Sequence, residues 1–145
     1  MIDYVDASAL TAVILKEPQS RLVDVVLRES SSALLLSDLC LTECSSAIAL
    51  AGRRNALDRQ VVKGLWDQLD AWVGAFAERI ATQAADVRSA NELVRHLHLK
   101  LRGPDAIHLA ATARLGARLI TLDRRMADAA RAVGVACINP AESSA

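Results

Sequence analysis

Five short apolar segments, separated by longer stretches of helical periodicity, constrain this chain more than any other feature. They are IDYV (2–5), ALLLS (33–37), ERIAT (78–82), RLITL (118–122) and VACI (135–138). Each has the length of a β-strand, and a continuous apolar run such as ALLLS is typical of a strand buried on both faces of a parallel sheet. The alternation of strands and helices predicts a three-layer α/β domain, with helices flanking a mainly parallel central sheet.

The spacing of apolar residues and the positions of Pro and Gly predict where the helices lie. Pro18 closes the first helix, and Pro104 suits the first turn of another because its ring presets the backbone angle there. The predicted helices cover residues 8–17, 20–29, 39–51, 57–76, 83–100, 103–116 and 123–134. Without a linker or repeat, the pattern predicts a single domain over residues 1–140, followed by a frayed tail at 141–145.

Composition narrows the environment of the protein. The chain has 17 basic residues (Lys and Arg) and 17 acidic residues (Asp and Glu), so its formal net charge is zero. The overall charge therefore gives no reason to expect nucleic-acid binding. Asp38, Glu43 and Arg53 interrupt the longest apolar stretch, so we expect no membrane span. The N-terminus lacks the basic start of a signal peptide. Three cysteines without a framework spacing suggest reduced thiols. A cytoplasmic location follows as an expectation.

Four acids stand in apolar surroundings at similar places in the predicted fold. Asp6 and Asp123 each follow a predicted strand and precede a helix. Asp105 lies in the first turn of a helix, and Glu43 is the one charged residue between Asp38 and Arg53. Because ligands of open parallel sheets bind beyond the carboxyl ends of the strands, we expect all four at one rim of the sheet.

Each acid also has a local structural interpretation. Asp6 and Asp123 could be helix N-caps, and Asp105 could interact with the positive end of the helix dipole. Glu43 is harder to explain locally, because a carboxylate on an apolar helix face is costly to bury unless it is paired or binds a metal. Four converging carboxylates would repel one another, and a hard divalent cation such as Mg²⁺ or Mn²⁺ relieves that repulsion. Such a site can activate water for attack on phosphorus.

Four stretches resemble, in order, the motifs of PIN-domain ribonucleases, and most closely VapC-type toxins of bacterial type II toxin–antitoxin pairs. They are YVDASAL, LTECSSAI, RGPDAIHLAATARLGA and LITLDRRMADAA. The resemblance covers nearly the whole chain and implies the PIN fold. It places the catalytic, metal-binding acids at Asp6, Glu43, Asp105 and Asp123.

The resemblance also implies an activity and partners. The expected reaction is Mg²⁺- or Mn²⁺-dependent endonucleolytic cleavage of RNA, with a metal-activated water as the nucleophile. The expected partners are the RNA substrate, a VapB-like antitoxin that blocks the site, and a second copy of the chain in a homodimer.

Several neighbours of the acids are candidates for supporting roles. Ser8 matches the small hydroxyl residue that follows the first Asp in this family, although it could equally cap the first helix. Thr121 precedes Asp123 in a similar supporting position. Arg124 and Arg125 flank Asp123 and are the best candidates for RNA phosphate contacts. Asp3 is excluded, because strand alternation puts positions 3 and 6 on opposite faces and predicts that Asp3 faces outward.

The histidines and cysteines are expected to be structural. His108 lies three residues after Asp105 and so on the same side of its helix, but metal–water chemistry needs no protein base, which favours a core role. Cys40 and Cys44 lie one helical turn apart without a further set of zinc ligands, which favours small core residues.

Two surface features remain open. Basic residues cluster at Arg53, Arg54, Arg59 and Lys63, and again at Arg95, Lys100 and Arg102. Solvation alone explains such clusters as well as RNA binding does. The wide apolar stripe of residues 57–76, with two Trp, is expected to be mainly core, although it would also suit a groove for an antitoxin helix.

Two other functions fit parts of the pattern. A catalytically silent PIN-like domain could bind RNA or protein, but it would have no need of four acids. A metal-dependent phosphatase would use similar ligands, but the chain lacks the D-x-D nucleophile motif of a common phosphatase class.

Overall fold

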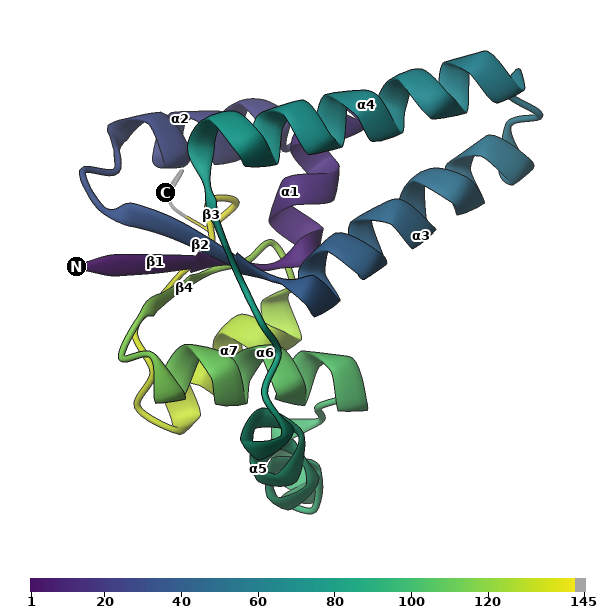
Figure 1. Ribbon diagram of the computed structural model, residues 1–145. Helices are drawn as coiled ribbons and strands as arrows, with labels where there is room; N and C mark the ends of the chain where they lie inside the picture. The colour runs from purple at the N-terminus through teal and green to yellow at the C-terminus, as the bar shows by residue number, and fades with distance from the viewer. Residues whose placement is uncertain (143–145) are drawn as a thin grey trace.

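In the computed structural model, which describes residues 1–142, a five-stranded sheet separates two layers of helices (Figure 1). All neighbouring strands are parallel, in the order β3-β2-β1-β4-β5. The strands are β1 (Ile2–Val5), β2 (Ala33–Ser37), β3 (Glu78–Ile80), β4 (Arg118–Ile120) and β5 (Cys137–Ile138). The predicted three-layer α/β class is confirmed, and the sheet is wholly parallel.

The helices α1, α2 and α4 cover one face of the sheet, and α5, α6 and α7 cover the other (Figure 1). The α3 helix leaves the end of β2 and forms a long hairpin with α4 that extends beyond the sheet. The bounds are α1 (Ala7–Ile14), α2 (Ser20–Glu29), α3 (Asp38–Arg54), α4 (Arg59–Phe76), α5 (Ala84–Val94), α6 (Gly103–Arg114) and α7 (Arg124–Ala132).

Strand alternation divides the core into two clusters. Val5 and Ile120 contribute to the cluster shared with α1, α2, α3 and α4. Tyr4 and Leu119, the preceding residues in the same strands, contribute to the cluster shared with α6 and α7. Successive side chains of a strand point to opposite faces, which explains this division. Burial on both faces fixes β1 and β4, and with them the residues that follow at their carboxyl ends.

The expectation that Asp3 faces outward is wrong. Asp3 is fully buried and pairs with Arg118, its register partner on β4. The guanidinium donates two hydrogen bonds, at 2.8 and 3.0 Å, and Ser30 donates a third at 2.6 Å. Asp3 still lies on the opposite face of β1 from Asp6, toward the amino-terminal end of the strand. A buried carboxylate is tolerated here because both of its oxygens accept hydrogen bonds, from the guanidinium and from the Ser30 hydroxyl.

The predicted helix over residues 83–100 is two elements. The α5 helix ends at Val94, and a 3₁₀ turn, η1 (Leu97–Leu99), follows. Lys100 then adopts a left-handed backbone conformation, with φ of 54°. This break turns Leu99 into the core while Leu97 stays exposed. Tertiary packing of Leu99 therefore overrides the helical periodicity.

The apolar stripe of residues 57–76 is only partly core. Leu69 is buried, and Trp72 and Val73 pack against the first cluster. Trp66 and Phe76 are 38% and 62% exposed. The α3–α4 hairpin reaches past the sheet, so much of the stripe has nothing within the described chain to cover it.

Residues 140–142 form a turn at the carboxyl-terminal end of the described chain. Asn139 accepts hydrogen bonds from the backbone N–H groups of Ala141 and Glu142. The rest of the predicted frayed tail, residues 143–145, lies outside the described residues. Within residues 1–142, no helix is both long enough and apolar enough to cross a membrane.

Candidate metal centre at the carboxyl ends of the strands

The candidate site lies where the order of the sheet reverses. From β1, the chain passes to β2 and β3 on one side, whereas β4 and β5 lie on the other. Asp6 directly follows β1, and Asp123 comes shortly after β4. The crevice at such a reversal is the usual ligand site of open parallel sheets. Sequence reasoning thus placed these two acids at the correct edge.

Asp6 is held by three donors in a buried position. Its Oδ1 accepts hydrogen bonds from Ser8 Oγ at 2.7 Å and from the backbone N–H of Ala9 at 3.1 Å. Its Oδ2 accepts from Thr121 Oγ1 at 2.6 Å. Burial raises the pKa of Asp6 above its usual value of 3.8, although these hydrogen bonds oppose the shift. The bond from Ala9 makes Asp6 the N-cap of α1, so the capping and site interpretations apply to the same residue.

Ser8 and Thr121 connect the ends of β1 and β4. Their hydroxyl oxygens lie 3.2 Å apart, and Ser8 Oγ accepts a hydrogen bond from the backbone N–H of Leu122. Thr121 Oγ1 also accepts from the backbone N–H of Asp123 at 3.0 Å. One buried threonine hydroxyl therefore contacts both Asp6 and the Asp123 backbone. Ser8 does not cap α1, since Asp6 occupies that position.

The other three acids approach from different helices. Asp123 caps α7 by accepting from the backbone N–H groups of Arg125 and Met126. Asp105 lies in the first turn of α6, with its side chain 20% exposed and Arg102 at 3.5 Å. Burial, followed by the negative charges of Asp123 and Glu43, raises the pKa of Asp105. Asp105 therefore shares an electrostatic environment with Asp123 and Glu43.

Oxygen donors and mutual repulsion make this set suitable for a hard divalent cation. In the part of the chain that the structure describes, no three His, Cys, Asp or Glu side chains are already close enough to form a finished metal site. Repelling carboxylates favour separation until a cation binds between them. Mg²⁺ and Mn²⁺ accept such ligands together with water, so they need no complete protein cage. The residues present therefore fit such a cation.

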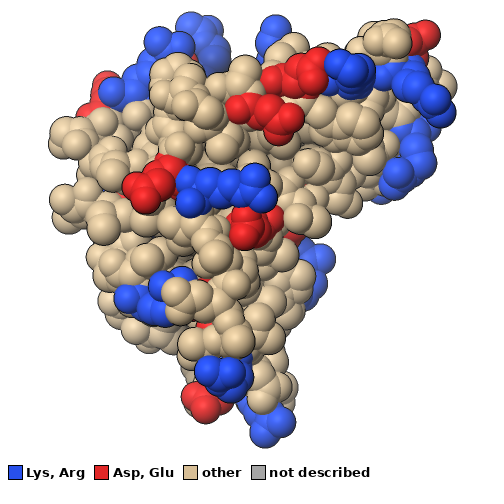
Figure 2. Space-filling view, in the orientation of Figure 1, with Lys and Arg blue, Asp and Glu red and all other residues tan. Residues whose placement is uncertain are grey.

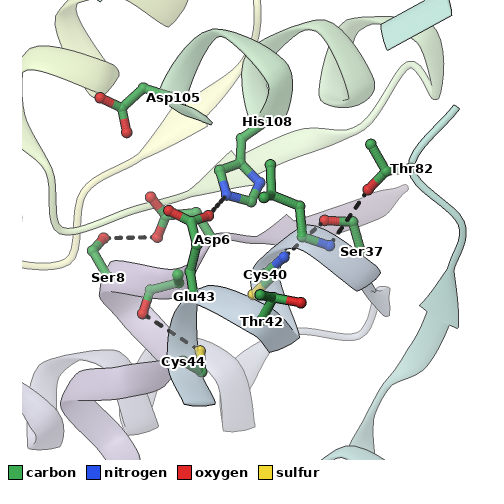
Figure 3. Close-up of polar contacts among 12 residues, drawn as sticks. Asp6, Ser8, Ser37, Cys40, Thr42, Glu43, Cys44, Thr82, Asp105 and His108 are labelled. Carbon is green, nitrogen blue, oxygen red and sulfur yellow. Dashed lines mark hydrogen bonds and ion pairs between the residues drawn. The ribbon is translucent and has the colours of Figure 1, made fainter. Parts of the chain in front are cut away.

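His108 was expected to be a core residue, and it is buried, but it also contacts the site. Its side chain is 2% exposed, and its Nε2 hydrogen-bonds to Glu43 Oε1 (Figure 3). Its Nδ1 lies 2.7 Å from the hydroxyl of Tyr4. The three-residue spacing from Asp105 placed His108 on the correct side of α6, but nothing in the sequence paired it with Glu43. Cys40 and Cys44 are buried on α3 as expected.

An open cleft of about 560 Å³ is lined by two of the four acids, Glu43 and Asp123, and by Ser8. Arg124 and Arg125 are exposed beside Asp123, in the first turn of α7. Arg53 and Arg54 end α3 and Arg59 begins α4, with Lys63 one turn further along, so this basic cluster lies at the tip of the α3–α4 hairpin, where Figure 2 shows a group of basic side chains. At 1.5 Å per residue, Arg54 is about 16 Å along α3 from Glu43, so this cluster is not part of the acid site.

Comparison with known proteins identifies the family. The PIN domain model matches residues 4–132, which is most of the chain. The chain belongs to the PIN-domain family. Ribonuclease VapC46 of Mycobacterium tuberculosis is 32% identical over 94% of this chain and 96% of that protein. The prediction that the chain is a VapC-type member of the PIN family is confirmed. The ribonuclease relative favours a nuclease over a catalytically silent domain.

Solved PIN-fold structures match at lower sequence identity and so support the fold. FitAcB from Neisseria gonorrhoeae has a TM-score of 0.74 and 17% identity, covering 96% of this chain and 98% of that chain. The toxin VapC20 of Mycobacterium tuberculosis, described as cleaving the sarcin–ricin loop, has a TM-score of 0.70 and 17% identity, with 94% and 97% covered. VapBC2 from Rickettsia felis, bound to a promoter DNA fragment, has a TM-score of 0.69 and 15% identity, with 95% and 98% covered.

Proposed function

We propose that this PIN-domain protein is the toxin of a type II toxin–antitoxin pair and cleaves RNA internally in the presence of Mg²⁺ or Mn²⁺. The observation that carries the proposal is that Asp6 and Asp123, connected through Thr121, follow the adjacent strands β1 and β4, while Glu43 and Asp123 line one open cleft. Burial and the negative charges of Asp123 and Glu43 raise the pKa of Asp105, and a bound cation would offset that repulsion.

The residues of the site would have two roles, as ligands of the cation and as contacts for the RNA. Asp6 provides a carboxylate whose orientation Ser8 and Thr121 fix, and Glu43, Asp105 and Asp123 complete the ligand set. A bound cation would supply Lewis acidity, which activates water and neutralises charge on the scissile phosphate. Arg124 and Arg125, exposed beside Asp123, would bind neighbouring phosphates of a single RNA strand that enters the cleft.

The activity is tested with purified protein and end-labelled RNA, in Mg²⁺, in Mn²⁺ and with chelator. The matched variants are Asp6→Asn and Asp67→Asn. The Asp67 side chain is 63% exposed on α4 and pairs with surface Lys63, so its loss leaves the site intact. We expect cleavage by the wild type and by Asp67→Asn, and little by Asp6→Asn or with chelator. Equal cleavage by all three proteins would exclude the assignment. Sequencing of RNA ends after induced expression would then name the substrate.

A VapB-like antitoxin is the proposed protein partner. A cleft of about 570 Å³ opens between α1, α2, β2 and α4, lined in part by Val13, Leu27, Trp72 and Phe76. Its apolar walls suit the apolar face of an antitoxin helix. A short open reading frame next to the gene, whose product co-purifies with the toxin and inhibits cleavage, would support this partner.

A homodimer is the second proposed assembly, and light scattering of the toxin alone tests it. The free thiols Cys40, Cys44 and Cys137 suit the proposed cytoplasmic location.

A further inference from the structure

A buried chain of hydrogen bonds leads from the backbone of α3 to the carboxylate of Glu43. The backbone N–H of Cys40 donates to Ser37 Oγ at 3.1 Å, and Ser37 Oγ lies 2.8 Å from the Tyr4 hydroxyl. Tyr4 in turn contacts His108 Nδ1 at 2.7 Å, and His108 Nε2 contacts Glu43. The chain therefore passes through the ends of β1 and β2 and through α6 before it returns to α3.

Burial gives this chain a fixed geometry. Tyr4, Ser37 and His108 are at most 2% exposed, and the rings of Tyr4 and His108 pack edge to face with their centroids 5.7 Å apart. Burial also raises the pKa of Tyr4 well above its ordinary value, so its hydroxyl stays protonated and can donate. With a partner at each ring nitrogen and close packing around it, the His108 imidazole is confined to one orientation.

The donors and acceptors along the chain determine how His108 meets Glu43. The Tyr4 hydroxyl donates its one proton to Ser37 Oγ at 2.8 Å, so its oxygen can accept a hydrogen bond from His108 Nδ1–H. At the other ring nitrogen, the contact between Nε2 and Glu43 Oε1 requires a proton between the two atoms, because two bare acceptors would repel each other. Each polar atom of the chain then has a partner, as buried polar groups require.

Glu43 needs such support more than Asp6 and Asp123 do. Asp6 receives three hydrogen bonds, and Asp123 is fixed as the cap of α7. Glu43 has a longer side chain, is 32% exposed at the cleft, and receives its hydrogen bond from His108. Ordering a free Glu side chain costs conformational entropy. A donor that already holds one carboxylate oxygen leaves the other oxygen directed to a cation.

We propose that His108 is a positioning residue that holds Glu43, through the hydrogen bond at Nε2 and with Tyr4 and Ser37 behind it, in the orientation that binds the cation. This inference rests on the proposed function, since it takes Glu43 to be a metal ligand. Partners of metal ligands typically change metal affinity about 10–100-fold when they are removed. His108 needs no contact with RNA or with the reacting atoms to have this effect.

The test is Mn²⁺ affinity, measured from the electron paramagnetic resonance signal of free Mn²⁺, with RNA cleavage measured in parallel. His108→Leu removes the donor and should weaken Mn²⁺ binding about 10–100-fold. His108→Gln places an amide N–H near the position of Nε2 and should restore much of that loss. Tyr4→Phe removes only the hydroxyl behind Nδ1 and should cause a smaller loss.

A double-mutant cycle separates positioning from general damage. In a Glu43→Ala background, adding His108→Leu should not weaken Mn²⁺ binding further, because the residue that His108 positions is already absent. Thermal unfolding of each variant identifies any that fails to fold, and Tyr4→Phe then carries the test. Wild-type affinity in both His108→Leu and Tyr4→Phe would overturn the positioning role. A wild-type protein that binds no Mn²⁺ and cuts no RNA would instead overturn the proposed function.

Discussion

Replacement of Arg118 by methionine should lower the free energy of unfolding by about 3–5 kcal/mol, because it leaves a buried carboxylate without its charged partner. Asp3 is 0% exposed, whereas the Arg118 side chain is 27% exposed. Methionine keeps most of the apolar stem of arginine but provides no donor. The hydrogen bond from Ser30 remains, and one neutral donor cannot compensate for both guanidinium bonds.

The opposite substitution should cost less. In Asp3→Asn, the unpaired group is the guanidinium, which reaches solvent, so the expected loss is about 1–2 kcal/mol. The double variant Asp3→Asn/Arg118→Met buries no charge and should be more stable than Arg118→Met alone. This order, with Arg118→Met the least stable of the three, follows from the unequal exposure of the two partners.

Urea denaturation followed by circular dichroism measures these differences. The loss in Arg118→Met corresponds to a decrease in Tm of roughly 10 °C for a chain of this size. The pair lies at the amino-terminal ends of the strands, so the Mn²⁺ affinity of the folded variants should match that of the wild type. Equal stability of Arg118→Met and Asp3→Asn, or a double variant less stable than either, would refute the reasoning.

Three further predictions concern the acid site. Thr121→Val removes the hydroxyl that donates to Asp6 and accepts from the Asp123 backbone. Its Mn²⁺ affinity, measured by calorimetric titration, should therefore decrease about 10–100-fold. Thr121→Ser keeps the hydroxyl and should bind Mn²⁺ about as tightly as the wild type. Asp105→Asn removes a carboxylate that Asp123 and Glu43 repel, so without metal it should unfold at the same temperature as the wild type or higher, and a large decrease would indicate a structural cap instead. Because the folded-state pKa values of Asp6 and Asp105 are raised, both groups favour the metal-free fold at acidic pH, and this contribution is lost as pH rises through those values. Mn²⁺ binding at mildly acidic pH should therefore release protons, which calorimetry in buffers of different ionisation enthalpy detects, and the release should decrease toward neutral pH.

The fold could be predicted from the sequence because its strands and caps are encoded locally. The apolar run at 33–37 coincides with β2, and Pro104 begins α6 as expected. The acids at the ends of β1 and β4 follow from the same pattern, since parallel strands deliver their carboxyl ends to one edge. The assignment of Glu43 and Asp105 to the same site depended on the family resemblance, which rests on the order of four sequence motifs.

The features that could not be predicted depend on contacts between distant residues. Asp3 and Arg118 are 115 positions apart, and strand alternation alone gives the face of Asp3 but not its burial or its partner. Glu43 and His108 are 65 positions apart on two helices, and helical spacing gives no information about their relative rotation. The exposed part of α4 was also misjudged, because periodicity shows which face is apolar but not whether the rest of the fold extends far enough to cover it.

The most direct test of the acid site is a crystal structure with Mn²⁺, in which anomalous scattering locates the ion. We expect a peak bound by carboxylate oxygens of the set Asp6, Glu43, Asp105 and Asp123, with metal–oxygen distances of about 2.0–2.2 Å. The peak should disappear or weaken in Asp6→Asn crystals prepared in the same way. A peak elsewhere on the molecule, or none at a Mn²⁺ concentration that supports RNA cleavage, would contradict the assignment of these four residues as the metal centre.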